Sequence, residues 1–279
     1  MDKRKIKKVV REKYGKIART GGSCCGTSGQ KGCCCGGSQE ATVISQKIGY
    51  RPEDLIAVPE GANLGLGCGN PVALADLKPG ETVLDLGAGA GFDCFLAASR
   101  VGQTGKVIGV DMTPEMLERA RENARKGNYH NVEFRLGEIE NLPVADNSID
   151  VIISNCVINL SPDKPRVFSE AYRVLKPGGR LMISDIVLTE ELPEYIRESV
   201  TAYAGCIAGA SLKTEYLKYI ESAGFENLTL VDETPFLIEG IENDPLAITL
   251  MNNLEIDIEQ TKKIASSILS LKVSAKKPS

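Results

Sequence analysis

The strongest constraint on the fold is an alternation of short apolar segments and helical patterns between Pro71 and Val187. Each apolar segment is long enough for one strand and is followed by a loop and by hydrophobic residues at helical spacing. Strands that alternate with helices form parallel sheets with helices on both faces, and right-handed crossovers then favour a doubly wound α/β sheet. The predicted strands are Thr82–Asp85, Lys106–Asp111, Val132–Leu136, Ile149–Ser154 and Arg180–Asp185.

The regions outside this core predict an extension before it and a mixed region after it. Residues 3–19 place apolar side chains at helical spacing between lysines and arginines, which predicts an amphipathic helix docked on the protein. Residues 21–38 are nearly all Gly, Ser and Cys and cannot bury a core, so we expect a flexible loop. The later elements are predicted as helix Glu194–Ala208, helix Lys213–Ala223 closed by a left-handed Gly224, strand Leu228–Asp232, helix Ile258–Ser267 and a late edge or antiparallel strand Leu269–Ala275.

These patterns predict a division of the chain into three parts. An N-terminal helical and cysteine-rich extension occupies residues 1–60, a Rossmann-like domain occupies 61–190, and a C-terminal α+β region that covers the substrate occupies 191–279. The boundaries follow the composition, because the Gly/Ser-rich segment lies in the first part and the strand–helix alternation lies in the second.

Composition and charge exclude several classes of protein. With 42% hydrophobic and 25% charged residues, the 279-residue chain has the composition of an ordinary globular protein. No apolar run approaches the roughly 20 residues that cross a bilayer, and the first residues lack the apolar stretch of a secretory signal. A net charge of −4 leaves no broad basic surface for nucleic acid, although residues 1–20 are locally basic. We therefore expect a cytoplasmic protein that binds neither a membrane nor a nucleic acid.

A glycine-rich loop directly follows the first predicted strand. Gly87, Gly89 and Gly91 allow the turn to pass close to a ligand and to face it with backbone N–H groups. The dinucleotide fingerprint G-x-G-x-x-G requires a third glycine where this chain has Phe92, so NAD is disfavoured. A glycine-rich loop alone remains weak support for any particular ligand.

Further features at the strand ends narrow the choice of ligand. Asp111 ends the second strand, where a carboxylate can accept hydrogen bonds from both hydroxyls of an adenosine ribose, and residues 137–140 follow the third strand, where an adenine ring would lie. With Pro-Gly turns at 77–80 and 175–179, this order of features resembles the class I S-adenosylmethionine-dependent methyltransferases across about residues 60–235. The resemblance implies S-adenosylmethionine as cofactor, bound by Asp85, Gly87, Ala88, Gly89, Asp111, Met112, Glu138, Ile139 and Asn155.

Cysteines occur at places where a methyl acceptor could be presented. Ligands of open α/β sheets bind beyond the carboxyl ends of the strands, so the reactive methyl should face the loop after the fourth strand, which contains Cys156. Cys68, ahead of the core, and Cys206, after the fifth strand, are flanked by glycines that we expect to keep a thiol accessible. Each cysteine alone is more often a small buried hydrophobe, but three that border one cleft favour a soft acceptor with its own lone pair, such as trivalent arsenic.

The chain offers no evident general base for methylation of oxygen or nitrogen. Histidine is the side chain most often used for that role, and the chain has one, His130. It lies in a polar turn, where a solvated loop residue is the simpler interpretation.

Four motifs connect these cysteines with a known family. Residues 67–71 (GCGNP), 153–160 (ISNCVINL), 204–209 (AGCIAG) and 137–143 (GEIENLP) resemble those of the arsenite methyltransferases. The resemblance implies that Cys68, Cys156 and Cys206 are the catalytic cysteines and bind the trivalent arsenical. We expect these cysteines to act as thiolates on thiol-conjugated arsenite, with a thiol reductant such as glutathione or thioredoxin as partner.

Five more cysteines crowd the Gly/Ser-rich segment, namely Cys24, Cys25, Cys33, Cys34 and Cys35. Adjacent cysteines are poor partners for one tetrahedral zinc, and no C-x-x-C pair occurs. Capture of arsenic or disulfide exchange is therefore favoured over a structural zinc site, and an incidental tail is the remaining alternative. Cys94, on the helix after the glycine loop, is expected in the core.

Two other functions remain open from the sequence. A methyltransferase that acts on a quinone or lipid carbon would use the cysteines only for packing. A thiol-rich protein that sequesters arsenic or metal would transfer no methyl group at all. Undiminished arsenite methylation by Cys156→Ser would exclude the cysteines as the ligand set, and methyl label found on arsenic would exclude the second function.

Overall fold

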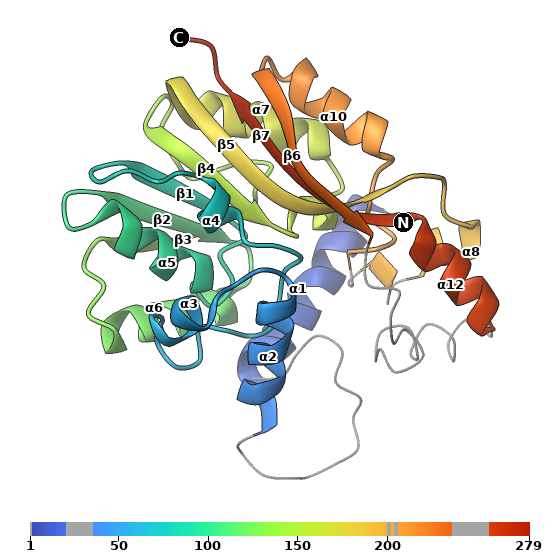
Figure 1. Ribbon diagram of the computed structural model, residues 1–279, viewed down its shortest axis with the longest axis horizontal. Helices are drawn as coiled ribbons and strands as arrows, with labels where there is room; N and C mark the ends of the chain where they lie inside the picture. Colours follow the sequence, from blue (N-terminus) through green and yellow to red (C-terminus); the bar gives the residue numbers. More distant parts are fainter. Residues whose placement is uncertain (1, 21–35, 200–201, 204–205, 236–256) are drawn as a thin grey trace.

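A parallel sheet, extended by an antiparallel pair, forms the centre of the protein (Figure 1). The computed structural model describes residues 2–20, 36–199, 202–203, 206–235 and 257–279. The strands within these ranges are β1 (Thr82–Leu86), β2 (Lys106–Asp111), β3 (Val132–Leu136), β4 (Ile149–Asn155), β5 (Leu175–Leu188), β6 (Glu226–Pro235) and β7 (Ile268–Lys276). Their order in the sheet is β3-β2-β1-β4-β5-β7-β6, and β7 is antiparallel to both β5 and β6.

Helices cover both faces of this sheet. The described helices are α1 (Lys3–Thr20), α2 (Gly36–Lys47), α3 (Pro52–Ile56), α4 (Pro71–Leu74), α5 (Phe92–Val101), α6 (Pro114–Lys126), the short 3-10 helix η1 (Ile158–Leu160), α7 (Lys164–Val174), α8 (Glu194–Arg197), α10 (Lys213–Ser222) and α12 (Ile258–Ser266). Helices α7 and α10 pack against one face, which contains Leu84 and Ile152. Helices α5 and α6 pack against the other face, which contains Val83 and Val151. Successive strand residues are therefore buried on opposite faces, which explains why these strands are apolar throughout.

The predicted doubly wound fold is confirmed, with one strand much longer than expected. The strand order reverses between β1 and β4, as in doubly wound sheets. β5 runs from Leu175 to Leu188 because β7 pairs along its whole second half, from Arg180 opposite Lys276 to Leu188 opposite Ile268. The late antiparallel strand was predicted correctly, but it lies inside the sheet, so β6 forms the edge.

Two predictions of local structure were wrong. Residues 36–38 belong to helix α2 rather than to a flexible loop, and this helix is held by tertiary packing, with Ala41 buried where the absence of a side chain at Gly65 leaves room. The helix predicted for Glu194–Ala208 is interrupted, because α8 ends at Arg197 and helical structure returns only at Ala202 and Tyr203 among the described residues. Residues 206–209 form a turn instead, because Cys206 has a φ of +67°, which no α-helix contains.

Helix α1 docks on the protein, as predicted. It packs against α6 and η1, and its apolar side chains Ile6 and Val10 are buried. Lys7 forms ion pairs with Glu138 at 2.7 Å and Glu140 at 3.3 Å, in the loop that follows β3. Part of the basic face of α1 therefore forms ion pairs with acidic side chains of the same protein.

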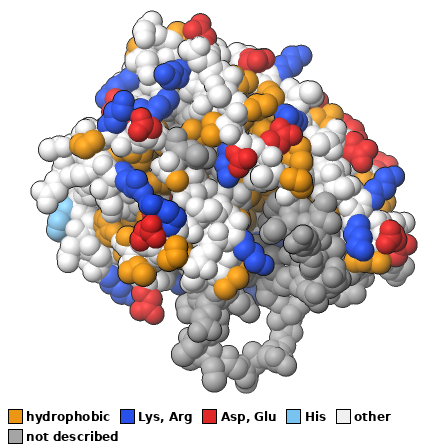
Figure 2. All heavy atoms as spheres, in the orientation of Figure 1, with side chains coloured by type: hydrophobic (Ala, Val, Ile, Leu, Met, Phe, Trp, Pro, Cys, Tyr) orange, Lys and Arg blue, Asp and Glu red, His pale blue; other side chains and the backbone are white. Residues whose placement is uncertain are grey.

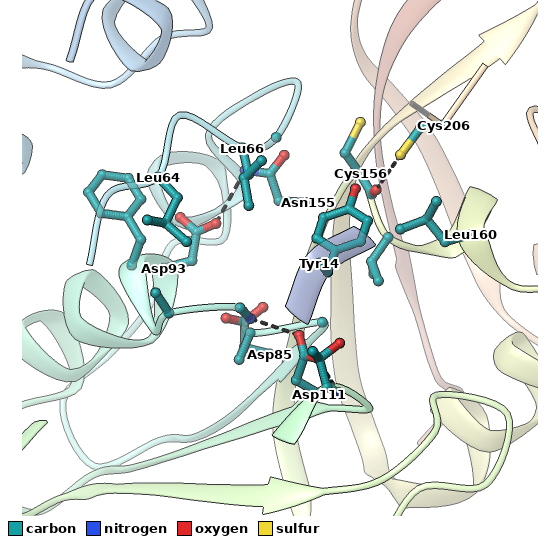
Figure 3. Close-up of a pocket in the computed structure, with 18 of the residues that line it drawn as sticks. Tyr14, Leu64, Leu66, Asp85, Asp93, Asp111, Asn155, Cys156, Leu160 and Cys206 are labelled. Carbon is teal, nitrogen blue, oxygen red and sulfur yellow. Dashed lines mark hydrogen bonds between the residues drawn. The ribbon is translucent and has the colours of Figure 1, made fainter. Parts of the chain in front are cut away.

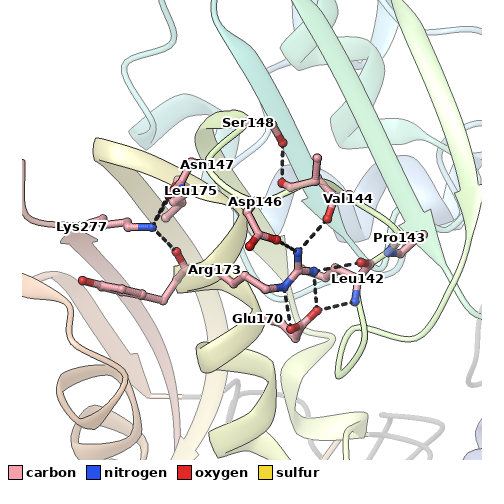
Figure 4. Close-up of polar contacts among 12 residues, drawn as sticks. Leu142, Pro143, Val144, Asp146, Asn147, Ser148, Glu170, Arg173, Leu175 and Lys277 are labelled. Atoms are coloured by element: carbon pink, nitrogen blue, oxygen red, sulfur yellow. Dashed lines mark hydrogen bonds and ion pairs between the residues drawn. The ribbon is translucent and has the colours of Figure 1, made fainter.

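The loop that follows β3 is fixed to helix α7 by Arg173 (Figure 4). The guanidinium donates to the backbone oxygens of Leu142 at 3.1 Å and Val144 at 2.9 Å, and it binds the carboxylate of Glu170 at 2.7 Å. The backbone N–H of Leu142 also donates to Glu170, at 2.8 Å. These bonds hold in place the loop that carries Ile139.

The surface gives no broad region of a single charge on the face that Figure 2 shows. Lys and Arg side chains lie among Asp and Glu side chains there. Among the described residues, none of the helices combines the length and the apolar character that a membrane span requires.

Candidate active site at the carboxyl edge of the sheet

A cavity of about 300 Å³ opens at the carboxyl ends of β1, β2 and β4, where the strand order reverses (Figure 3). Helix α1 and residues 62–67 also contribute to its lining. Most of the predicted site residues line this cavity; they are Asp85, Gly87, Ala88, Gly89, Asp111, Met112, Ile139, Asn155, Cys156 and Cys206. Figure 3 shows Asp85 and Asp111 toward one side of the pocket and Cys156 and Cys206 toward the other. Cys68 and Glu138 do not line it.

The glycine loop leaves space for a ligand. Gly87, Gly89 and Gly91 have φ of +71°, +51° and +94°, a left-handed region that favours glycine. A side chain at Gly87 would collide with Val157, whereas nothing lies within 4 Å of the Cβ position at Gly89. The loop therefore presents open backbone to the cavity beside Gly89.

Asp111 is held in a fixed orientation at the end of β2. Its Oδ2 accepts a hydrogen bond from the backbone N–H of Gly89 at 3.0 Å, and its Oδ1 accepts one from the N–H of Thr113 at 2.8 Å. Burial raises the pKa of Asp111, while these hydrogen bonds lower it. Met112 and Ile139 add apolar side chains to the lining. A fixed acid beside apolar side chains fits the hydroxyls of a ribose and the ring of an adenine.

A buried polar network connects the glycine loop with the end of β4. The hydroxyl of Tyr50 donates to Asp93 Oδ1 at 2.6 Å, and Asn155 Nδ2 donates to Asp93 Oδ2 at 3.2 Å. The Cys94 thiol, which is fully buried as predicted, donates to Asp85 Oδ2 at 3.1 Å. Burial raises the pKa of Asp93 to about 6 and the pKa of Asp85 well above its ordinary value.

Tyr50 and Asp93 were not predicted as site residues. Asp93 lies in the first turn of α5, directly after the glycine loop, so an acid at that helix end was a usable signal. Tyr50 is 43 residues earlier in the chain and meets Asp93 only through tertiary packing.

Cys156 and Cys206 have an unusual backbone conformation. Cys156 directly follows β4, and its φ is +58°, while that of Cys206 is +67°. Positive φ is uncommon for residues other than glycine and is found disproportionately at functional sites. The Cys206 thiol donates to the backbone oxygen of Cys156 at 3.1 Å, which places the two residues side by side (Figure 3).

Cys68 is buried next to Cys156. The sulfurs of Cys68 and Cys156 and a carboxylate oxygen of Asp185 all lie within 4.8 Å of one another. The backbone of Cys68 is held on both sides, because its N–H donates to Asn155 Oδ1 at 2.9 Å and its oxygen accepts from the Ser270 hydroxyl at 3.0 Å. The structure thus brings the three predicted cysteines together, although Cys68 does not reach the cavity lining.

The glycines around Cys68 have a role other than the one expected. A side chain at Gly67 would collide with Asn155, and one at Gly69 would collide with Ser184. Cys68 itself is 5% exposed. The glycines therefore permit close packing of this segment and do not keep the thiol accessible, so that part of the sequence interpretation was wrong.

Burial keeps two of the thiols protonated. It raises the pKa of Cys68. Hydrogen bonds with the thiols of Cys206 and Cys68, together with burial, raise the pKa of Cys156 well above its ordinary value. The thiolate form that we expected is therefore not the resting form of Cys68 and Cys156, and it must develop as a sulfur binds its ligand.

Asp185 lies beside Cys68 and Cys156, and the sequence did not identify it. It is fully buried on β5, and burial raises its pKa to about 6. Its Oδ1 accepts from Asn159 Nδ2 at 2.8 Å and from the N–H of Ile186 at 2.9 Å, and its Oδ2 accepts from the Tyr216 hydroxyl at 3.0 Å. An acid near the carboxyl end of a parallel strand was a usable signal, because such ends meet at one edge of the sheet.

The remaining predicted residues lie away from the cavity or outside the described residues. The carboxylate of Glu138 is paired with Lys7 at 2.7 Å and with Arg11 at 3.6 Å. His130 is exposed in a turn, as its sequence context suggested. The predicted capture cysteines lie outside the described residues; they are Cys24, Cys25, Cys33, Cys34 and Cys35.

Comparison with known proteins gives one consistent family. A family model described as "Methyltransferase domain" matches residues 77–224. The chain is 50% identical over 250 residues to an arsenite methyltransferase of Halobacterium salinarum, and 42% identical over 172 residues to the arsenite methyltransferase of Homo sapiens. The crystal structure of an arsenic(III) S-adenosylmethionine methyltransferase from Chlamydomonas reinhardtii is similar, with a TM-score of 0.63 and 33% identity over 86% of this chain and 73% of that one.

The relatives are longer than this chain. The matches cover 87% of the chain and 63% of the Halobacterium salinarum protein, and 57% of the chain and 45% of the human protein. Parts of both relatives therefore have no counterpart in the matched region.

Proposed function

The chain belongs to the arsenite methyltransferases, a family of class I methyltransferases, and on this premise we propose that it transfers methyl groups from S-adenosylmethionine to trivalent arsenic held by Cys68, Cys156 and Cys206. One observation carries the proposal. A single cavity is lined by the glycine loop and Asp111 and also by Cys156 and Cys206. A methyl donor and a sulfur-bound acceptor can therefore meet inside one space, where fixed alignment replaces a bimolecular encounter.

The residues of the donor half fit S-adenosylmethionine. Open space beside Gly89 receives the ligand, and the fixed carboxylate of Asp111 accepts hydrogen bonds from ribose hydroxyls. Met112 and Ile139 offer apolar contacts to the adenine. The bound donor supplies an electrophilic methyl group on a sulfonium. The contacts expected for Asp85, Gly87, Ala88 and Asn155 belong to the same proposal.

The cysteines exchange onto arsenic from a small thiol conjugate. Each Cys–arsenic bond that forms releases one thiol proton, which leaves with the departing small thiol, so no separate base is needed. This exchange agrees with the raised pKa values of Cys68 and Cys156, because the thiols need not ionise before arsenic binds. Three sulfurs leave the arsenic lone pair free to attack the methyl carbon.

Return of the product to the trivalent state requires two electrons. Two neighbouring cysteines supply them by forming a disulfide, and an external thiol reductant such as glutathione or thioredoxin restores the pair. Free thiols are maintained in a reducing compartment, and we therefore propose the cytoplasm as the location. For the cysteines at 24–25 and 33–35 we keep the proposal of arsenic capture.

An assay with arsenite, a thiol and methyl-labelled S-adenosylmethionine tests the proposal. We expect label on arsenic with the full chain and loss of that label with Cys156→Ser. Ser169→Ala is the control, since its hydroxyl donates to the backbone oxygen of Pro165 on the exposed side of α7 and does not line the cavity. Full activity of Cys156→Ser would reject the ligand set, and binding of arsenite without transfer of label would favour a sequestering protein.

A further inference from the structure

A carboxylate lies beside the sulfurs of Cys68 and Cys156, and the proposed binding of arsenic does not use it. One oxygen of Asp185 lies within 4.8 Å of the sulfurs of both Cys68 and Cys156. Arsenic bound by three sulfurs holds its lone pair in the fourth position, so an oxygen ligand has no place on it. The proposed methyl transfer therefore gives Asp185 no ligand role.

The carboxylate of Asp185 is held by three hydrogen bonds. Its Oδ1 has two hydrogen-bond donors, Asn159 and Ile186, while Oδ2 has one, the hydroxyl of Tyr216. A carboxylate oxygen has two lone pairs, so Oδ2 keeps one for a further partner. Metal-binding carboxylates are commonly held by such hydrogen bonds, which fix the direction of the ligand oxygen.

The donor set fits a thiophilic divalent cation. Zn²⁺ takes four ligands in a tetrahedron and readily combines thiolates with a carboxylate. Its bond lengths place neighbouring ligand atoms roughly 3.5 Å apart, so atoms that lie within 4.8 Å of one another need to approach by no more than about 1 Å. A water is the fourth ligand, because Cys206, whose thiol contacts the backbone oxygen of Cys156, does not belong to the group of atoms within 4.8 Å of one another.

We propose that Cys68, Cys156 and Asp185 form a binding site for a thiophilic divalent cation such as Zn²⁺ or Cd²⁺. Binding forms two metal–sulfur bonds and one metal–oxygen bond and releases the two thiol protons to solvent. The cation and arsenic exclude each other because both require the sulfurs of Cys68 and Cys156. This inference goes beyond the proposed methyl transfer and does not depend on it, since a chain without transferase activity would still bind the cation.

The direct test is a titration with Cd²⁺, followed by its thiolate charge-transfer absorption. The full chain is used with serine in place of the cysteines at 24, 25, 33, 34 and 35, so that these contribute no signal. We expect one Cd²⁺ per chain, a much weaker signal in the same background with Cys156→Ser, and displacement of Cd²⁺ by arsenite. Equal titration curves with and without Cys156 would overturn the proposal.

The role of Asp185 is tested by selectivity. Asp185→Asn should weaken Cd²⁺ binding at least about tenfold more than it weakens arsenite binding, because only the divalent cation uses the oxygen. The matched control is Asp76→Asn, since Asp76 is exposed and has a φ of +45°, which asparagine tolerates. Equal losses of Cd²⁺ and arsenite binding in Asp185→Asn would reject the oxygen as a ligand.

A second variant covers the case in which Asp185→Asn does not fold. Tyr216→Phe keeps the buried ring and its edge contact with Phe168, with ring centroids 5.5 Å apart, and removes only the hydroxyl that orients Asp185. We expect Cd²⁺ affinity to fall about tenfold in this variant. Unchanged Cd²⁺ affinity in a folded Tyr216→Phe protein would count against Asp185 as a ligand. Absence of methyl transfer by the unsubstituted chain, with its Cd²⁺ binding intact, would instead reject the proposed function alone.

Discussion

The side-chain oxygen of Asn155 accepts a hydrogen bond from the backbone N–H of Cys68 at 2.9 Å. The Nδ2 of the same amide donates to the backbone oxygen of Gly69 at 2.7 Å and to the hydroxyl of Tyr50 at 2.9 Å. Both ends of the amide are therefore used by the protein. Asn155 ties the Cys68 segment to the end of β4, which makes it a positioning residue for the sulfur of Cys68.

Asn155→Ala should weaken arsenite binding. The loss of buried hydrogen bonds costs about 1–3 kcal/mol, so we expect the dissociation constant for arsenite to rise about tenfold. Direct titration with arsenite measures the change. The control is Asn131→Ala, whose side chain donates to Ala98 and Gly102 and does not line the cavity. A selective loss of donor binding, with arsenite binding unchanged, would instead favour the cofactor contact that the sequence predicted for Asn155.

Ser270 of β7 should support Cys68 from the other side. Its hydroxyl donates to the backbone oxygen of Cys68 at 3.0 Å. A net hydrogen bond is worth about 1 kcal/mol, so Ser270→Ala should raise the KM for arsenite about fivefold with little change in kcat. Ser270→Thr keeps the hydroxyl and should restore KM, and Ser274→Ala, on the same face of the same strand, should leave it unchanged. If the KM for arsenite changes with the stability of β7 and not with the presence of the hydroxyl, Ser270 does not support Cys68 in this way.

Asp111 should dominate binding of the methyl donor. Hydrogen bonds to a charged group are worth about 1.5–3 kcal/mol each, so Asp111→Asn should reduce affinity for S-adenosylhomocysteine by about 100-fold. Calorimetric titration measures this, with the exposed Glu118→Gln on α6 as control. Unchanged affinity of Asp111→Asn for S-adenosylhomocysteine would place the ribose contacts elsewhere in the cavity.

The sequence predicts the donor half of the site better than the acceptor half. The glycine loop directly follows β1 and Asp111 ends β2, so a local pattern gives both their residue type and their position in a parallel sheet. Cys156 was found for the same reason, because it follows β4. The role of a residue in the folded chain was harder to predict. The glycines beside Cys68 were interpreted wrongly because their close neighbours come from distant strands.

Contacts made only by tertiary packing could not be predicted. Ser270 is 202 residues from Cys68, and the strand that carries it was predicted as a late edge or antiparallel strand, whereas it lies between β5 and β6. Glu138 was expected at the adenine, but Lys7 of α1 approaches it from 131 residues away. Neither contact can be predicted from the residues that are adjacent in the sequence. Asp185 could have been found, since it lies near the end of a predicted strand.

The ion pairs of Lys7 should control how firmly α1 covers the cavity. Lys7 is 24% exposed and Glu138 is 38% exposed, so solvent screens the pair and it is worth about 0.5 kcal/mol. Lys7→Met keeps the apolar stem and should increase amide hydrogen exchange in α1 about twofold, with a smaller dependence on salt than in the wild type. Lys8→Met is the control, because the ion pair of Lys8 is with Glu12 of its own helix, at 3.8 Å. Equal exchange in both variants would show that apolar packing alone holds α1.

Asp185 should make stability depend on pH in the acidic range. Burial raises its pKa to about 6 from the ordinary value of 3.8, while hydrogen bonds from Ile186 and Tyr216 lower it. The folded protein therefore holds this proton more tightly than the unfolded chain does. Its stabilising contribution is complete below about pH 4 and is lost as the pH rises through about 6. The interval from 3.8 to about 6 corresponds to about 3 kcal/mol.

Asp185→Asn cannot titrate at this position, so it isolates that contribution. The free energy of unfolding of the wild type, minus that of the variant, should increase by up to about 3 kcal/mol as the pH falls from about 7 to about 4. Urea unfolding of both proteins across this range measures the difference, and the other acids, present in both proteins, cancel in the subtraction. A difference that stays constant with pH would mean that Asp185 has the same pKa in the folded and unfolded chains, which is incompatible with a carboxyl group buried beside two protonated thiols.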